Sequence, residues 1–145
     1  MPKEGVVLFA AAAGPLPQSN LASSHGDGVG WVDIALAPPS DSKLFQDGSE
    51  GWLAYVYRDL AFIKTFEDAP SDTAAPGEAE IEVFVNGLYD YVEVEQQGRY
   101  LLPPTGGATR WQVNWLLRRV PAGLDTSLGS APLVAWVREQ VATLR

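Results

Sequence analysis

The segment from residue 78 to residue 95 constrains the fold of this chain more than any other part of its sequence. It opens with an apolar series alternating with a polar or aromatic one: Ala79, Ile81, Val83 and Val85 against Glu78, Glu80, Glu82 and Phe84. Such alternation is typical of a strand with one buried face. Asn86-Gly87 follows and favours a two-residue type I′ turn, because both central positions of that turn need positive φ. The return strand, Leu88 to Glu95, buries Val92 and Val94, so the segment predicts an antiparallel hairpin.

Other parts of the chain extend this pattern. Strands are predicted over residues 6–11, 31–36, 52–57, 60–66, 100–102 and 111–117. Polar segments rich in glycine and proline predict loops at 18–30, 41–51 and 68–77, and Arg58-Asp59 predicts a tight turn. Near the end, Ser130 can cap a helix whose apolar residues recur at helical spacing: Leu133, Trp136, Val137, Val141 and Leu144. The predicted fold is a mostly β, jelly-roll-like antiparallel β-sandwich or open barrel with one C-terminal α-helix.

The length of 145 residues and the 46% hydrophobic content fit a single domain. A chain of this size buries roughly 68–70% of its unfolded surface in one core. Within the domain 1–145 we expect N-terminal strands and a polar loop at 1–37, a β core at 38–118 and the helix at 130–145.

Charge and residue usage exclude several classes of function. The net charge of −8 disfavours binding to nucleic acid or to an anionic membrane surface. The absence of cysteine and the single histidine exclude thiolate chemistry and a multi-histidine metal site. No apolar run approaches the ~18 residues of a membrane span. Residues 1–17 have the outline of a weak signal peptide, but Glu4 beside Lys3 favours a buried first strand, and therefore a cytoplasmic over a secreted location.

Six short motifs carry a resemblance to a known family: Gly51-Trp-Leu-Ala-Tyr55, Leu60-Ala-Phe-Ile-Lys-Thr-Phe66, Ala79-Glu-Ile-Glu-Val-Phe84, Tyr91-Val-Glu-Val-Glu95, Leu102-Pro-Pro104 and Trp111-Gln-Val-Asn-Trp115. In order and spacing, over about positions 38 to 118, they resemble the C-terminal half of galactose-mutarotase-like sandwich domains, nearest to an uncharacterised bacterial group. The resemblance implies a β-sandwich whose concave sheet faces carbohydrate. It also implies a catalytic base near Glu93 or Glu95.

The members of that family are substantially longer than this chain. Their catalytic histidines lie in a half without a counterpart here, and His25 does not match their pattern, so mutarotase activity is not carried over. A half-length sandwich would have open sheet edges, which favour a homodimer.

The glutamates of the predicted hairpin are the most distinctive candidate site. A two-residue turn pairs Glu82 with Tyr91, Glu80 with Glu93 and Glu78 with Glu95, so that carboxylates crowd one face. Like charges directly opposite each other destabilise a sheet. Three explanations stay open: a solvated polar face, a Ca²⁺ ion held by Glu80, Glu82, Glu93 and Glu95, or neutralisation by Lys64, Arg110 or Arg118.

Two further groups of residues were considered as sites. His25, with Asp27 and Ser23 or Ser24, has the residue types of a hydrolytic triad, or is a mobile loop histidine. Most aromatic residues are predicted to lie in the core, while one or two on a sheet face could stack on a sugar ring. The candidate ligand-binding residues are Lys64, Tyr91, Arg110 and Trp111.

We expect the protein to bind or process a neutral sugar-like small molecule on a concave sheet face. The alternative is a Ca²⁺-dependent hydrolase of a small ester or lactone. In it the cation polarises the carbonyl and Glu93 or Glu95, with His25 as a further candidate, activates water. A third interpretation is a subunit-contact module.

Overall fold

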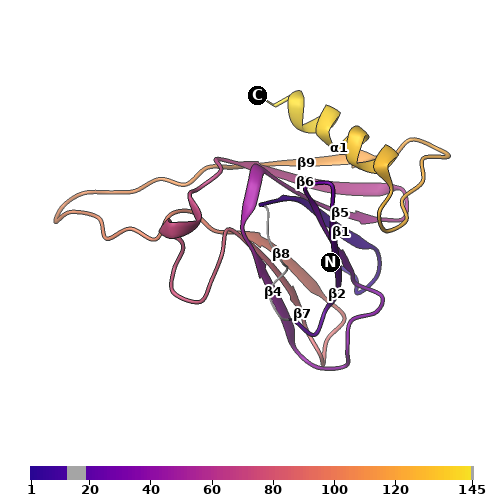
Figure 1. The fold of residues 1–145 in the computed structure, drawn as a ribbon, viewed down its shortest axis with the longest axis horizontal. Coiled ribbons are helices and arrows are strands. Elements are labelled where there is room, and N and C mark those ends of the chain that lie inside the picture. Colours follow the sequence, from indigo (N-terminus) through magenta and orange to yellow (C-terminus); the bar gives the residue numbers. More distant parts are fainter. Residues whose placement is uncertain (13–18, 145) are drawn as a thin grey trace.

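The computed structural model describes residues 1–12 and 19–144, which form two antiparallel sheets and a C-terminal helix (Figure 1). The large sheet has the strand order β2 (Ala22–Gly26), β3 (Val29–Asp33), β1 (Val6–Ala11), β5 (Gly48–Tyr57), β6 (Leu60–Phe66) and β9 (Val113–Arg119). The small sheet has the order β4 (Ser42–Gln46), β7 (Ile81–Val85) and β8 (Val92–Gln96). The helix α1 spans Ala131–Ala142, and a short 3₁₀ turn, η1, spans Ser71–Thr73.

The large sheet is the middle layer of the molecule, with α1 against its outer face and the small sheet against its inner face (Figure 1). The predicted open sandwich with one C-terminal helix is therefore confirmed, and the sheets do not close into a barrel. No helix in the described part of the chain is long and apolar enough to span a membrane.

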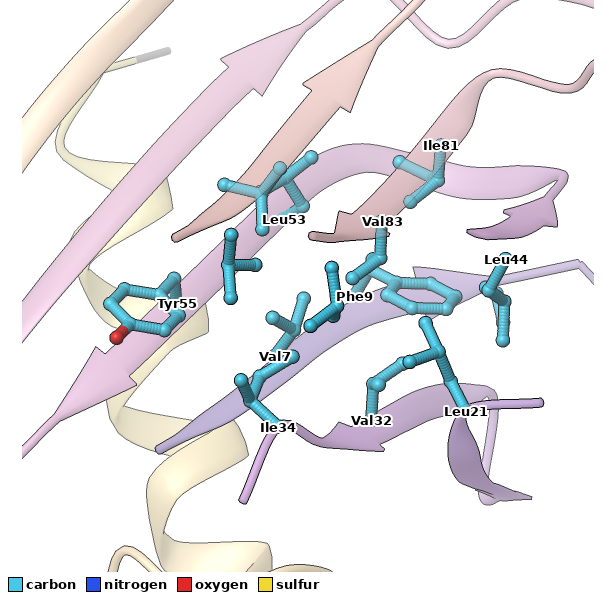
Figure 2. Close-up of a cluster of buried hydrophobic side chains, with 14 of the residues drawn as sticks. Val7, Phe9, Leu21, Val32, Ile34, Leu44, Leu53, Tyr55, Ile81 and Val83 are labelled. Carbon is cyan, nitrogen blue, oxygen red and sulfur yellow. The ribbon is translucent and has the colours of Figure 1, made fainter. Parts of the chain in front are cut away.

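The core between the two sheets is built from the alternating apolar residues of both. Figure 2 shows Phe9 and Leu53 of the large sheet facing Ile81 and Val83 of the small one. All four are fully buried. Burying such side chains stabilises a fold by about 1.5–3 kcal/mol each, so these pairs hold the two sheets together.

A second core lies between the large sheet and α1. Its buried residues include Trp52 and Ile63 from the sheet and Leu133 and Val137 from the helix. The Ser130 hydroxyl accepts a hydrogen bond from the backbone N–H of Leu133, as the predicted cap requires. Arg138 and Glu50 join the helix to the sheet, with Nη2 2.5 Å from Oε1.

Two polar segments that we predicted as loops contain strands, so this part of the prediction is wrong. Residues 18–30 contain β2 and the beginning of β3, joined by Asp27-Gly28, whose φ values are 52° and 72°. This is the two-residue turn with positive φ that favours hairpins. Residues 41–51 contain β4 and the beginning of β5. The pairing of β4 with β7 buries Ser42, Leu44 and Gln46, and only one of these three is apolar, so the sequence shows no apolar alternation there. The brief strand expected at 100–102 is absent from the structure.

The predicted register of the 78–95 hairpin is also wrong. Val85 pairs with Val92 and Glu82 with Glu95, so residues 86–91 form a longer connection. The side-chain oxygen of Asn86 accepts from the backbone N–H groups of Leu88 and Tyr89, which builds a local turn within that connection. Gly87 is needed for close packing rather than for positive φ, because a Cβ there would lie 2.5 Å from the Ser40 backbone.

The difference in size between the sheets positions the candidate site. The small sheet has three strands and the large sheet six, so one part of the inner face stays uncovered. That part lies on β5, β6 and the edge strand β9, where Leu60, Trp115 and Leu117 are exposed.

Candidate functional site

The uncovered part of the inner face forms a groove with a cavity volume of about 420 Å³. We call it the inner-face groove; it is lined by Met1, Pro2, Tyr55, Tyr57, Leu60, Phe62, Lys64, Trp115 and Leu117. Strand alternation directs every second side chain of β5, β6 and β9 into it. Its volume lies within the range of small-molecule sites, and its lining is mostly apolar.

Trp115 forms an exposed aromatic surface in this groove. Its side chain pairs across the strands with Lys64, and the residue is 69% exposed. The Phe62 ring supports it edge to face, with ring centroids 5.6 Å apart and an interplanar angle of 84°. The alternation in β9 predicted that Trp115 and Leu117 lie on the buried face of this strand, and this is wrong because no described strand of the small sheet extends over them. Leu116, pointing the other way, is buried in the core under α1.

Lys64 is the buried cation of the groove and is 7% exposed. Its Nζ donates a hydrogen bond to the backbone carbonyl of Val94, 2.6 Å away on β8. The same Nζ lies 5.5 Å from the ring centroid of Phe62 and 5.3 Å from that of Trp115. Burial lowers the pKa of Lys64, and the negative charge of Glu95 only partly opposes this.

The first residues of the chain close one side of the groove. The amino group of Met1 donates to the Val92 carbonyl at 3.2 Å, and the Met1 carbonyl accepts from the Val92 N–H at 2.8 Å. The Tyr55 hydroxyl lies 2.9 Å from the Pro2 carbonyl and 2.8 Å from the Glu4 carbonyl. Burial raises the pKa of Tyr55 to about 12, so the hydroxyl keeps its proton at neutral pH.

The outer face of the small sheet carries the acidic cluster of Glu82, Glu93 and Glu95. Glu82 is 5% exposed; it forms an ion pair with Lys43 and accepts a hydrogen bond from Gln97 Nε2 at 3.1 Å. Burial raises the pKa of Glu95, and the charges of Glu82 and Glu93 add to this. Lys43 therefore neutralises the charge of Glu82 on this face. The expectation that Lys64, Arg110 or Arg118 would do so is wrong, because Lys64 lies on the inner face and Lys43 occupies the strand beside Glu82.

Glu80 is separated from this cluster and belongs to a second one with Asp47 and Asp68. Its Oε1 accepts from the Ala69 N–H at 2.7 Å, and its Oε2 forms no well-aligned hydrogen bond within the described residues. Burial is the main reason why the pKa of Glu80 rises to about 7; Asp68 and Asp47 raise it further, while the amides of Ala69 and Gly48 oppose the rise. A Cβ at Gly48 would lie 2.0 Å from Oε2, so a larger residue there would displace the Glu80 carboxylate. The adjoining cavity of about 10 Å³ has room for about one water molecule.

The four glutamates predicted to bind Ca²⁺ are thus divided between two environments. Among residues 1–12 and 19–144, no group of three or more histidine, aspartate or glutamate side chains is arranged to hold a metal ion. Calcium binding by Glu80, Glu82, Glu93 and Glu95 stays a prediction.

Of the other predicted site residues, Arg110 and Trp111 line a second cavity of about 330 Å³ beside Phe66, while His25 and Tyr91 lie elsewhere. His25 is exposed on β2, and Arg110 is exposed in the connection before β9. Tyr91 contacts the Phe84 ring, with centroids 6.2 Å apart, and its hydroxyl accepts from Asn86. Trp111 packs on Phe66, with centroids 6.2 Å apart. Of the four predicted ligand-binding residues, only Lys64 lines the inner-face groove.

The groove residues that sequence reasoning missed are Tyr55, Tyr57, Trp115 and Leu117, which we assigned to the core. Their alternation indicates only that they share a face of a sheet. The sequence did contain one useful signal. Lys64 stands between Phe62 and Phe66 on the apolar face of the strand, and a lysine in such a place indicates that the face is open to solvent nearby.

No protein-family model matches the chain, and no curated protein or solved structure matches it either. The resemblance to galactose-mutarotase-like domains stays a prediction.

Proposed function

We propose that the protein binds a neutral, ring-shaped small molecule, such as a sugar, in the inner-face groove. The observation that carries this proposal is the exposed indole of Trp115, which Phe62 supports from below in a groove of about 420 Å³. The apolar face of a sugar ring packs on such an indole, as aromatic side chains pack on one another.

The polar groups of the groove favour a neutral ligand over a charged one. Lys64 and the hydroxyls of Tyr55 and Tyr57 lie among apolar side chains and can orient a hydroxyl or carbonyl group. A carboxylate or phosphate would have to lose its water in this apolar setting against a lysine whose pKa burial has already lowered.

Binding is tested by titrating methyl glucoside and methyl galactoside while the indole N–H signals of the five tryptophans are followed by NMR. We expect a saturable shift of the Trp115 signal, its loss in Trp115→Ala, and unchanged binding in Tyr100→Ala, which removes an exposed aromatic ring outside the groove. The absence of a saturable shift up to the solubility limit of the sugars would contradict the proposal.

The hydrolase alternative draws less support from the geometry. It needs a cation near Glu93 or Glu95, and the ammonium of Lys43 already lies beside Glu82 on that face. Homodimer formation also stays a prediction; the edge strand β9, with Trp115 and Leu117 exposed, is the surface that favours it.

A further inference from the structure

Lys64 differs from the other lysines in what it contacts. The chain has three: Lys3, Lys43 and Lys64. Lys43 forms an ion pair with Glu82, and its side chain is 52% exposed. Lys64 forms no ion pair with any described residue; its Nζ donates only to the Val94 carbonyl and faces two aromatic rings. An amine that is desolvated in an apolar pocket loses its proton more easily and becomes a nucleophile.

We propose that Lys64 binds a neutral aldehyde covalently, as a reversible imine, in the inner-face groove. This inference rests on the proposed function, because the groove must first hold the body of the ligand. It goes further by naming the reactive group of the ligand and the atom that attacks it. An aromatic aldehyde, whose ring carries the carbonyl group, belongs to this class of ligand.

The geometry brings the reacting atoms together. A ring stacked on Trp115 lies about 3.5–4 Å above the indole, while Nζ of Lys64 is 5.3 Å from the indole centroid. A ring that stacks on the indole beside Lys64 would bring an attached carbonyl group within reach of Nζ. The hydrogen bond to Val94 fixes one N–H of the amine, which leaves its lone pair directed away from that carbonyl oxygen.

The reaction needs no other reagent. The lone pair of the unprotonated Nζ attacks the carbonyl carbon, the C=O π electrons move to oxygen, and a proton shift from nitrogen to oxygen gives a carbinolamine. Loss of the hydroxyl group as water, with the second proton from nitrogen, gives the C=N bond. Addition of water reverses both steps. The surrounding polar groups are the hydroxyls of Tyr55 and Tyr57 and the amino group of Met1, with Glu95 acting from β8.

The test traps the imine by reduction. The folded protein is incubated with benzaldehyde and sodium cyanoborohydride, which reduces an imine in preference to the free aldehyde, and the modified residues are located by peptide mass spectrometry. Because burial lowers the pKa of Lys64, a larger share of its amine is unprotonated than in an exposed lysine. We therefore expect Lys64 to be labelled several times faster than Lys43 or Lys3, and the mapping separates it from the amino group of Met1.

Variants and a second probe make the outcome decisive. Lys64→Arg should abolish the fast labelling, Lys64→Met should do the same if the arginine variant does not fold, and the control Lys43→Arg should leave it unchanged. Equal labelling of the lysines, or fast labelling that survives Lys64→Arg, would overturn the proposal.

Benzyl alcohol has the same ring without the carbonyl. If it shifts the Trp115 signal while Lys64 is not labelled, the imine is refuted and the binding groove stands. If it causes no shift and Lys64 is not labelled, both proposals fail.

Discussion

The outer face of the small sheet and the inner-face groove each hold a lysine between two aromatic rings. Lys43 lies 5.7 Å and 5.3 Å from the ring centroids of Phe45 and Phe84, and Lys64 lies 5.5 Å and 5.3 Å from those of Phe62 and Trp115. The two lysines differ in their anion and in their burial: Lys43 pairs with Glu82 and its side chain is half exposed, whereas Lys64 is buried and forms no ion pair with a described residue. The hydrogen bond to Glu82 raises the pKa of Lys43, whereas burial lowers that of Lys64.

This comparison shows that contacts with aromatic rings do not replace a carboxylate partner. A cation–π contact contributes about 0.5–2 kcal/mol, which is less than the cost of burying an unpaired ammonium group. Lys43 therefore has its anionic partner, Glu82, within the fold. Lys64 keeps a carbonyl contact on one side and faces an open groove on the other.

The largest change in the free energy of unfolding is expected for a substitution of Glu80. This residue extends the comparison to a buried carboxylate without a cation. Because the pKa of Glu80 rises from 4.5 to about 7 in the fold, the folded protein holds this proton more tightly than the unfolded chain. Stability should therefore fall as pH rises from 4.5 through 7. At pH 8, Glu80→Gln should raise the free energy of unfolding by up to about 3 kcal/mol, and at pH 4.5 by much less.

Urea unfolding at the two pH values measures this effect. The matched control is Glu82→Gln, which should destabilise the protein at both, because Lys43 loses its partner. A Glu80→Gln variant that is equally or less stable than the wild type at pH 8 would contradict the expected penalty.

Lys43→Met should destabilise the protein by about 2 kcal/mol, because the buried carboxylate of Glu82 is left with only the Gln97 amide. The double variant Lys43→Met with Glu82→Met should recover most of this loss, since both charges are then absent. Thermal unfolding at neutral pH measures both changes, and additive losses in the double variant would show that the two residues do not interact.

Lys64→Met should change the free energy of unfolding by less than about 1 kcal/mol. The variant loses one hydrogen bond to the Val94 carbonyl, but it also no longer buries an unpaired ammonium group. Comparison with Lys43→Met in the same urea titration measures the difference between the two lysines. Equal losses in the two variants would remove the distinction between a paired and an unpaired lysine.

The smallest change in stability is expected on addition of calcium. The ammonium of Lys43 competes with Ca²⁺ for Glu82, so we expect the ion to raise the melting temperature of the wild type no more than NaCl of the same ionic strength. Lys43→Gln should uncover a response to Ca²⁺ beyond this salt control, and adding Glu95→Gln should reduce it. A response of the wild type beyond the salt control would instead support the calcium site predicted from the sequence.

The strands with regular apolar alternation and the capped helix could be predicted from the sequence because burial dictates their pattern. Residues 60–66 form β6 with the predicted bounds, and Ser130 caps α1. The strands β2 and β4 could not be predicted in this way: β2 has no fully buried side chain, and β4 buries the polar Ser42 and Gln46 beside Leu44, so that apolar alternation is missing from both. Asn86-Gly87 predicted a two-residue hairpin turn that does not form, because the Asn86 side chain accepts hydrogen bonds from Leu88 and Tyr89 and builds a longer turn.

The candidate site was only partly predictable for the same reason. Which face of β9 is open depends on how many strands the facing sheet contains, and the missed strand β4 is one of its three. The alternation that places Trp115 and Lys64 on one face was visible, but the exposure of that face was not. The contact of Lys43 with Glu82 joins residues far apart in the chain, and no local pattern indicates it.

The two backbone hydrogen bonds between Met1 and Val92 also bear on how the groove forms during folding. They join positions separated by 91 residues, so the chain must close a very large loop before β8 is sealed. Contacts of such long range are made late in folding, after the hairpins have formed. We therefore expect the Val92 amide to exchange its hydrogen by local fraying of the first residues, faster than the amides inside the large sheet.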